Sequence, residues 1–255
     1  MSHAHNHPAY HPRPSVYPPL DTLKPVAPDL WIVDSGPLRA MGLPIPVRMT
    51  VVRLKSGDLW LHSPTRYDEG LKCALEQLGP IRHLVAPNVA HWSYIKEWQT
   101  RCVGVTTWAA PGLRRRWQVR RSGLVLDADL ASSPPPEWEK DFEQVIAKGG
   151  FGVNEVAFLH LPSRTLVLTD LIENFEPEKL SMPTRVILRL LGTTAPDGRA
   201  PVYLRFVMTR RRRQAAAAAQ RMLDWAPQRV IFAHGRWFSE DATARLKKSL
   251  RWLLN

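Results

Sequence analysis

RTLVLTD at residues 164–170 and RVIFAHG at residues 229–235 share one pattern, in which a short apolar run is followed at once by polar residues. Runs of this length and composition are typical of buried strands. In layered α/β folds, strand ends and the loops after them hold the ligands. Asp170 and His234, which lie at the ends of the two runs, are therefore the first candidates for a functional site.

The sequence before residue 132 predicts strands first and then alternating strands and helices. A Ser-Gly-Asp turn at 56–58 joins two strand-like runs, and Leu71, Leu75 and Leu78 have helical spacing before Gly79, a natural C-cap. Such alternation indicates α/β architecture. The expected strands lie at 30–36, 47–63, 81–87 and 103–111, and the expected helices at 67–79, 91–102 and 112–121.

The second half repeats this order after a break. The three prolines of SSPPPEW (132–138) cannot lie inside a helix or a central strand. Strands resume directly after them, and a Pro-Ser-Arg turn joins the last two into a hairpin. The expected strands lie at 142–148, 154–161, 164–170 and 229–235, and the expected helices at 183–192, 203–225 and 239–254. The repeated order suggests two similar halves with strands between outer helices.

Length and composition favour one large domain. A chain of 255 residues with 44% apolar content can build one core. We expect residues 1–28, rich in proline and carrying His3, His5, His7 and His11, to form a flexible arm outside that core. Residues 29–255 would then be a single domain whose two halves meet near 131–138.

The charge balance limits the classes of partner. A formal net charge of +12 attracts anions, including an anionic small molecule. Nucleic acid is not the expected partner, because no DNA- or RNA-binding motif accompanies the basic residues. The sequence contains no apolar run long enough to span a membrane and no signal peptide, so we expect a cytoplasmic protein. Cys73 and Cys102 are expected to be reduced thiols.

Two further segments place polar residues beside predicted strands. Asn88 and His91 follow the strand at 81–87, and Glu155 lies in the segment GFGVNE (150–155) that leads into the next strand. Strand-LTD, a helical insertion, strand-AHG and a last helix together resemble the ending of the metallo-β-lactamase superfamily, and the likeness covers residues 30–255. With LHSPT, VAPN and NEV, the chain looks closer still to a bacterial and plant family of unknown function that is metallo-β-lactamase-like.

The resemblance implies a four-layer αβ/βα sandwich, with Asp170 bridging metals and His234 as a terminal ligand. The superfamily's main metal motif, HxHxDH, is absent, however. In register, Asn88, Ala90, Trp92 and Ser93 replace its four ligands, and Phe151 replaces a further histidine. A complete dinuclear zinc site is therefore not expected.

A mononuclear site remains chemically sensible. His91, Asp170 and His234 would supply two imidazoles and one carboxylate, a familiar ligand set for one Zn²⁺ or Fe²⁺ ion with open positions for water or substrate. Glu155 or Asn88 would orient the water, so Asp170, Glu155 and Asn88 are the catalytic candidates. The first hypothesis is thus a metal-dependent hydrolase of unknown substrate.

Several alternatives stay open from the sequence alone. Asp170 could cap a following helix while His234 hydrogen-bonds in a turn, and the chain would then be an inactive, metal-free relative that binds an anionic small molecule or a protein partner. Glu173 and Asn174 either line the same cleft or begin the next helix. His62, His83 and His160 are expected to be structural histidines. Neither the substrate nor the oligomeric state is predicted.

Overall fold

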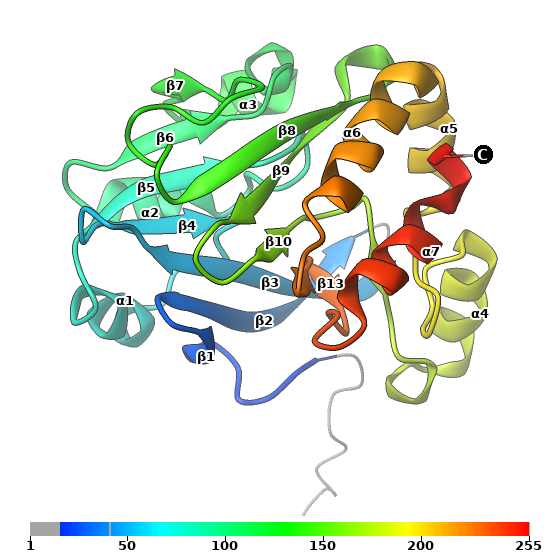
Figure 1. The fold of residues 1–255 in the computed structure, drawn as a ribbon. Helices are drawn as coiled ribbons and strands as arrows, with labels where there is room; N and C mark the ends of the chain where they lie inside the picture. The colour runs from blue at the N-terminus through cyan, green and yellow to red at the C-terminus, as the bar shows by residue number, and fades with distance from the viewer. Residues whose placement is uncertain (1–15, 41, 255) are drawn as a thin grey trace, which may run out of the picture.

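Two β-sheets that face each other organise the protein (Figure 1), described here by a computed structural model covering residues 16–40 and 42–254. The larger sheet has seven strands in the order β1-β2-β3-β4-β5-β6-β7, and the smaller has four in the order β12-β10-β9-β8. The first comprises β1 Lys24–Ala27, β2 Leu30–Ala40, β3 Leu43–Arg53, β4 Leu59–His62, β5 Ile81–Ala86, β6 Thr106–Ala109 and β7 Ala128–Asp129. The second comprises β8 Phe142–Lys148, β9 Asn154–His160, β10 Thr165–Val167 and β12 Arg229–Ile231.

The helices lie on the outer faces of these sheets. Figure 1 shows α1 and α2 beside the larger sheet, and α6 and α7 over the smaller one. None of the helices in the described ranges is long and apolar enough to cross a membrane. Their bounds are α1 Glu69–Glu76, α2 Ile95–Arg101, α3 Trp117–Ser122, α4 Met182–Leu191, α5 Val202–Thr209, α6 Arg212–Asp224 and α7 Ala242–Leu254.

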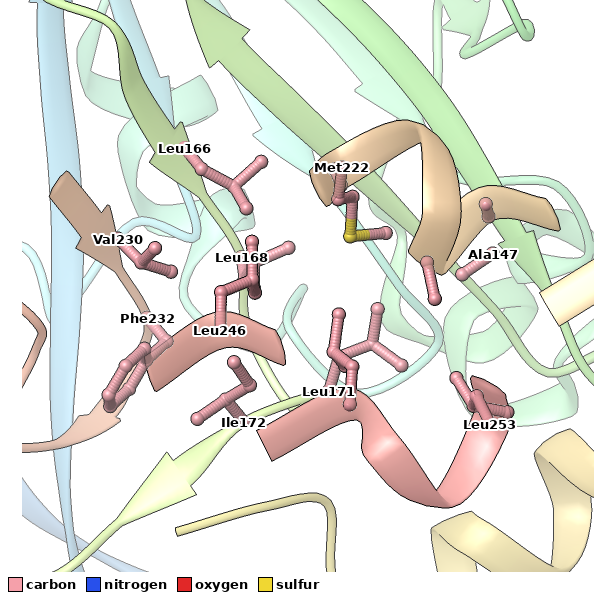
Figure 2. Packing of buried hydrophobic residues seen from close by; sticks show 14 of the residues in the cluster. Ala147, Leu166, Leu168, Leu171, Ile172, Met222, Val230, Phe232, Leu246 and Leu253 are labelled. Atoms are coloured by element: carbon pink, nitrogen blue, oxygen red, sulfur yellow. The ribbon is translucent and has the colours of Figure 1, made fainter. Parts of the chain in front are cut away.

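Three buried clusters fill the three interfaces between the layers. Leu75 and Trp98 of the first helices pack with residues of the larger sheet, and a second cluster around Trp60 and Phe158 joins the two sheets. Figure 2 shows the third cluster, where Leu246 of α7 lies with side chains of α6 and the smaller sheet. Three interfaces require four layers, so the fold is the αβ/βα sandwich that the sequence predicts.

Strand direction brings the two sequence signals together. β10 and β12 are parallel neighbours, with Val167 paired to Ile231. Asp170 and His234 each lie three residues beyond this pair, so both emerge at the same edge of the sheet. A short parallel ladder between β11 Glu173–Asn174 and β13 His234–Gly235 continues there and fixes the backbone around His234.

Three boundaries differ clearly from the sequence predictions. Residues 24–27, assigned to the arm, form the edge strand β1 on β2, a place where Pro25 is tolerated. The predicted helix over 203–225 is broken at Arg211, whose backbone is not helical and whose N–H group bonds to the carbonyl oxygen of Met208, three residues back, as in a 3-10 turn at a helix end. The last helix begins at Ala242 rather than at 239, because Asp241 has a left-handed backbone. The first 15 residues, including the arm histidines, lie outside the described residues.

Gly79 has a different role from the predicted one. Helix α1 ends at Glu76, three residues before this glycine. A Cβ atom at Gly79 would lie 2.2 Å from the carbonyl oxygen of Gly57. Glycine is therefore required at position 79 because the backbone of the turn after β3 comes so close, not because the helix needs a left-handed cap.

Candidate metal centre

Two imidazoles and one carboxylate meet at the edge of the sandwich. Asp170 Oδ1 lies 2.9 Å from His91 Nε2 and 3.3 Å from His234 Nε2, and the two Nε2 atoms are 3.3 Å apart. In the described part of the chain, these three residues form the one group of three or more potential ligands that could hold a metal ion. His91 comes from the loop after β5, so the segment that lacks the HxHxDH motif still supplies one imidazole.

The distances suit a single ion. Ligand atoms held tetrahedrally about 2.0–2.1 Å from one zinc ion are about 3.3 Å from one another. The three separations in this structure are of that size. The residues present therefore fit one Zn²⁺ or Fe²⁺ ion, with the remaining coordination positions left for water or substrate.

Both imidazoles are held through their second ring nitrogen. His234 Nδ1 donates to the carbonyl oxygen of Pro46 (2.8 Å), so its Nε2 presents a lone pair to the site. His91 Nδ1 is 2.6 Å from Ser63 Oγ. Outer hydrogen bonds of this kind fix the tautomer and the ring orientation of metal-binding histidines. Ser63 directly follows β4 and has a left-handed backbone (φ 53°), which a serine rarely adopts.

Asn88 holds Asp170 and the loop that carries His91. Its amide nitrogen donates to Asp170 Oδ2 (2.7 Å) and to Thr169 Oγ1 (2.9 Å). Its amide oxygen accepts from the backbone N–H groups of Ala90 (2.8 Å) and His91 (2.9 Å). Asn88 thus positions two of the three candidate ligands.

Glu155 organises the backbone under Asp170. Its buried carboxylate accepts hydrogen bonds from the backbone N–H groups of Thr169 (2.7 Å), Asp170 (2.8 Å) and Leu171 (3.1 Å). A bridge between the backbones of Asn88 and Glu155 links this region to the loop after β5. Asn88 and Glu155 are thus both engaged within the protein, and their orientation of a water molecule stays a prediction.

The charges of the site compensate one another. Burial would raise the pKa of Asp170, but the two imidazoles outweigh it and hold that pKa well below its usual range. Burial would lower the pKa of His91, but the Asp170 carboxylate outweighs it and raises that pKa. Burial and the Asp170 charge raise the pKa of Glu155 to about 7. Burial raises the pKa of Glu173 to about 8.

A cavity of about 180 Å³ opens onto the three ligands. The wall of this cavity includes Ala90, Trp92 and Ser93. Phe151 lies elsewhere and is exposed to solvent. Much of the remaining wall is apolar. Its other lining residues include Leu38, Leu43, Ile45, Val47, Leu188, Leu191 and Tyr203.

Sequence reasoning missed the part that Ser63 plays and left Glu173 undecided. Glu173 lines the cavity, and Asn174 is buried in β11, so neither residue begins a helix. Asp170 does not cap a helix either, because β11 follows it. LHSPT (61–65) was a visible signal for Ser63, since it places a serine directly after a strand, but the contact with His91 spans 28 residues.

The other described histidines are structural, as predicted. His83 Nδ1 accepts from Trp108 Nε1 (3.2 Å), and His160 Nδ1 is 2.7 Å from Ser163 Oγ. The ring of His62 stacks on Trp60 with the centroids 5.3 Å apart.

Solved structures with this fold confirm the architecture. A metallo-β-lactamase from Pontibacter korlensis is 16% identical, with a TM-score of 0.61 over 92% of this chain and 99% of that one. The FIM-1 metallo-β-lactamase from Pseudomonas aeruginosa, in its mono-zinc form, is 16% identical, with a TM-score of 0.59 over 96% of this chain and 99% of that one. A variant of the flavo di-iron protein from Thermotoga maritima is 14% identical, with a TM-score of 0.64 over 93% of this chain and 62% of that one.

These likenesses establish a metallo-β-lactamase-like fold, since identities this low carry no more than the fold. No curated protein matches the sequence. The family described as a domain of unknown function, DUF4336, matches residues 30–191, which is more than half of the 255 residues. The chain therefore belongs to the DUF4336 family.

Proposed function

We propose that the protein is a hydrolase that uses one divalent metal ion held by His91, Asp170 and His234. The observation that carries this proposal is the convergence of three ligand atoms within hydrogen-bond distance of one another. With Zn²⁺ or Fe²⁺ held by these residues, the site would supply a Lewis acid and would lower the pKa of a water molecule, so that hydroxide would be available to attack a substrate near neutral pH.

The protein's own residues would orient this chemistry. Ser63 and the carbonyl group of Pro46 hold the two imidazole rings. Asn88 holds the carboxylate of Asp170, and Glu155 holds its backbone N–H group. With three protein ligands, the centre keeps a position for substrate, which is the arrangement of catalytic rather than structural zinc sites.

We propose a substrate that combines an apolar part with an anionic group. The apolar walls of the cavity support the first feature. The second is supported by the net charge of +12 and by Arg116, which lines an adjoining cavity that shares Ala90, Asp170 and Tyr203 with the first.

Elemental analysis of the full chain tests the metal proposal. His3, His5, His7 and His11 are first replaced by glutamine, so that the N-terminal histidines do not capture metal themselves. We expect about one equivalent of zinc or iron, lost in Asp170→Ala and His234→Ala and retained in His83→Gln, a buried histidine outside the site. An equal metal content in the parent protein and in all three of these variants would refute the assignment of Asp170 and His234 as ligands.

A second candidate function follows from one specific observation. Ser63 Oγ, His91 and Asp170 form a continuous hydrogen-bonded chain at the cavity wall, and Ser63 has a strained backbone. In the metal-free protein, Ser63 Oγ would attack an ester carbonyl as His91 Nδ1 takes its proton, and the ester C–O bond would break as His91 gives that proton to the leaving alcohol. A water molecule, deprotonated by His91, would then hydrolyse the acyl-enzyme, and the proton would return to Ser63 Oγ. Ester hydrolysis that resists chelators and covalent labelling of Ser63 by a fluorophosphonate would favour it, whereas loss of activity on chelation would favour the metal.

A further inference from the structure

Helices α4 and α5 expose an unusual amount of apolar surface. Of the eleven large hydrophobic side chains that are exposed in the described ranges, seven belong to these two helices. We call them the α4–α5 surface: Met182, Val186, Ile187, Leu190, Val202, Tyr203 and Phe206. The two helices adjoin where α4 ends, because Arg205 of α5 lies 3.3 Å from the position of a Cβ atom at Gly192. Single exposed hydrophobics are ordinary, but seven on two adjoining helices are typical of an interaction site.

Helix α4 is apolar on both of its sides. Thr184 and Leu188 are buried against the protein, as expected for an amphipathic helix. Met182, Val186 and Leu190 follow one another at intervals of four residues on the outer side, and Leu190 is 78% exposed. The fold explains the inner face of α4 but leaves its outer face without a partner in this structure.

The same segment is strongly basic. Residues 182–213 contain eight arginines and no lysine, and their only acidic residue is Asp197, whose carboxylate pairs with Lys248. The guanidinium of Arg210 lies 4.5 Å from the ring centre of Phe206, so charge and apolar surface are in direct contact. The partner of this surface must therefore offer negative charge and an apolar phase together.

The surface adjoins the cavity of the candidate metal centre at one residue. Tyr203 belongs to the α4–α5 surface and also lines the cavity that contains Asp170, where Leu188 and Leu191 of α4 line it too. A molecule bound at Tyr203 would thus lie next to the cavity.

We propose that the α4–α5 surface binds an anionic lipid bilayer, with its apolar side chains in the headgroup region and its arginines on lipid phosphates. Surface helices that combine leucine-type and aromatic residues with arginines bind membranes in this way.

Two other occupants fit the surface less well. Single-stranded nucleic acid is bound by aromatic stacking, but most of the exposed apolar residues here are aliphatic. A two-fold contact with a second copy of the chain would bring two sets of arginines together, and like charges across an interface are costly.

Sedimentation of the full chain with lipid vesicles tests this proposal without any need for catalysis. We expect binding to vesicles of equal phosphatidylcholine and phosphatidylglycerol that is at least ~10-fold tighter than to phosphatidylcholine alone, because each arginine near an anionic surface contributes about 1 kcal/mol. The double variant Ile187→Glu, Leu190→Glu should bind the anionic vesicles at least ~10-fold more weakly than the parent protein does. Val103→Glu, at a position that is 94% exposed but lies outside the surface, should bind like the parent protein. Circular dichroism melting checks that each variant is folded.

Four outcomes would overturn the proposal. The parent protein could fail to bind the anionic vesicles, or the double variant could bind them as well as the parent does. Tighter retention on single-stranded DNA than on anionic vesicles would assign the surface to nucleic acid. A dimer in light scattering that the double variant splits into monomers would assign it to a second copy of the chain.

Discussion

Replacing Glu155 by glutamine separates two roles that the residue could have. The sequence suggests that Glu155 orients a catalytic water, whereas in the structure its carboxylate accepts three backbone N–H groups beneath Asp170. The side-chain amide of glutamine can keep its oxygen on the N–H groups of Asp170 and Leu171, but its NH₂ group then faces the N–H group of Thr169. That buried N–H group is left without an acceptor, which costs about 1–3 kcal/mol.

We therefore expect Glu155→Gln to lower the free energy of unfolding by about 1–3 kcal/mol. Because the backbone of Asp170 loses its anchor, metal affinity should fall by about 10–100-fold, the usual effect of removing a group that orients a ligand. Urea unfolding of the apoprotein and a zinc titration measure the two quantities. Glu139→Gln, at an exposed glutamate, is the matched control and should change neither.

The alternative role gives the opposite pattern. If Glu155 acts on water alone, the variant keeps the stability and metal affinity of the parent and loses only turnover. That result would refute the view that the carboxylate holds the loop of Asp170.

Three other predictions concern the fold. Burial lowers the pKa of His160 to about 4, so the unfolded chain takes up a proton at a higher pH than the folded protein does. The free energy of unfolding should therefore fall by roughly 3 kcal/mol between pH 6.5 and 4. Denaturation curves of His160→Gln should lack that part of the decline, and an unchanged pH dependence in this variant would contradict the lowered pKa of His160. Leu246→Ala, which leaves a cavity between α7 and the smaller sheet, should lower the free energy of unfolding in urea by about 2–5 kcal/mol. A decrease below about 1 kcal/mol would show that the neighbouring side chains move in to fill the cavity. Gly79→Ala, which puts a Cβ atom 2.2 Å from the oxygen of Gly57, should lower the melting temperature, and an unchanged melting temperature would show that the turn at Gly57 moves aside at no cost.

The sequence predicts the strands and helices well where the apolar pattern is local. The short apolar runs at 164–170 and 229–235 predict the strands β10 and β12, and the parallel pairing of these strands places Asp170 and His234 at one edge of the sheet. Boundaries that depend on backbone conformation are not predicted by the apolar pattern. The break at Arg211 and the late start of α7 at Ala242 depend on single residues that leave helical geometry.

The hydrogen-bond network of the site was beyond sequence reasoning for a related reason. Asn88 and Asp170 are 82 residues apart, and no spacing rule connects an amide in one half with a carboxylate in the other. Glu155 was identified as a candidate because it is polar and lies beside a strand, but that pattern does not distinguish a group that faces water from one that binds three backbone N–H groups.

Asn88 connects the parts of the candidate site that come from the two halves of the fold. Its amide holds the carboxylate of Asp170 and the loop of His91, so one side chain positions two of the three candidate ligands. The residues that follow Asn88 in this loop, including Ala90 and Trp92, form wall of the cavity beside Asp170. Within residues 16–40 and 42–254, no second group of three potential ligands adjoins this one. The proposal of a single ion therefore follows from the ligand atoms that the fold brings together.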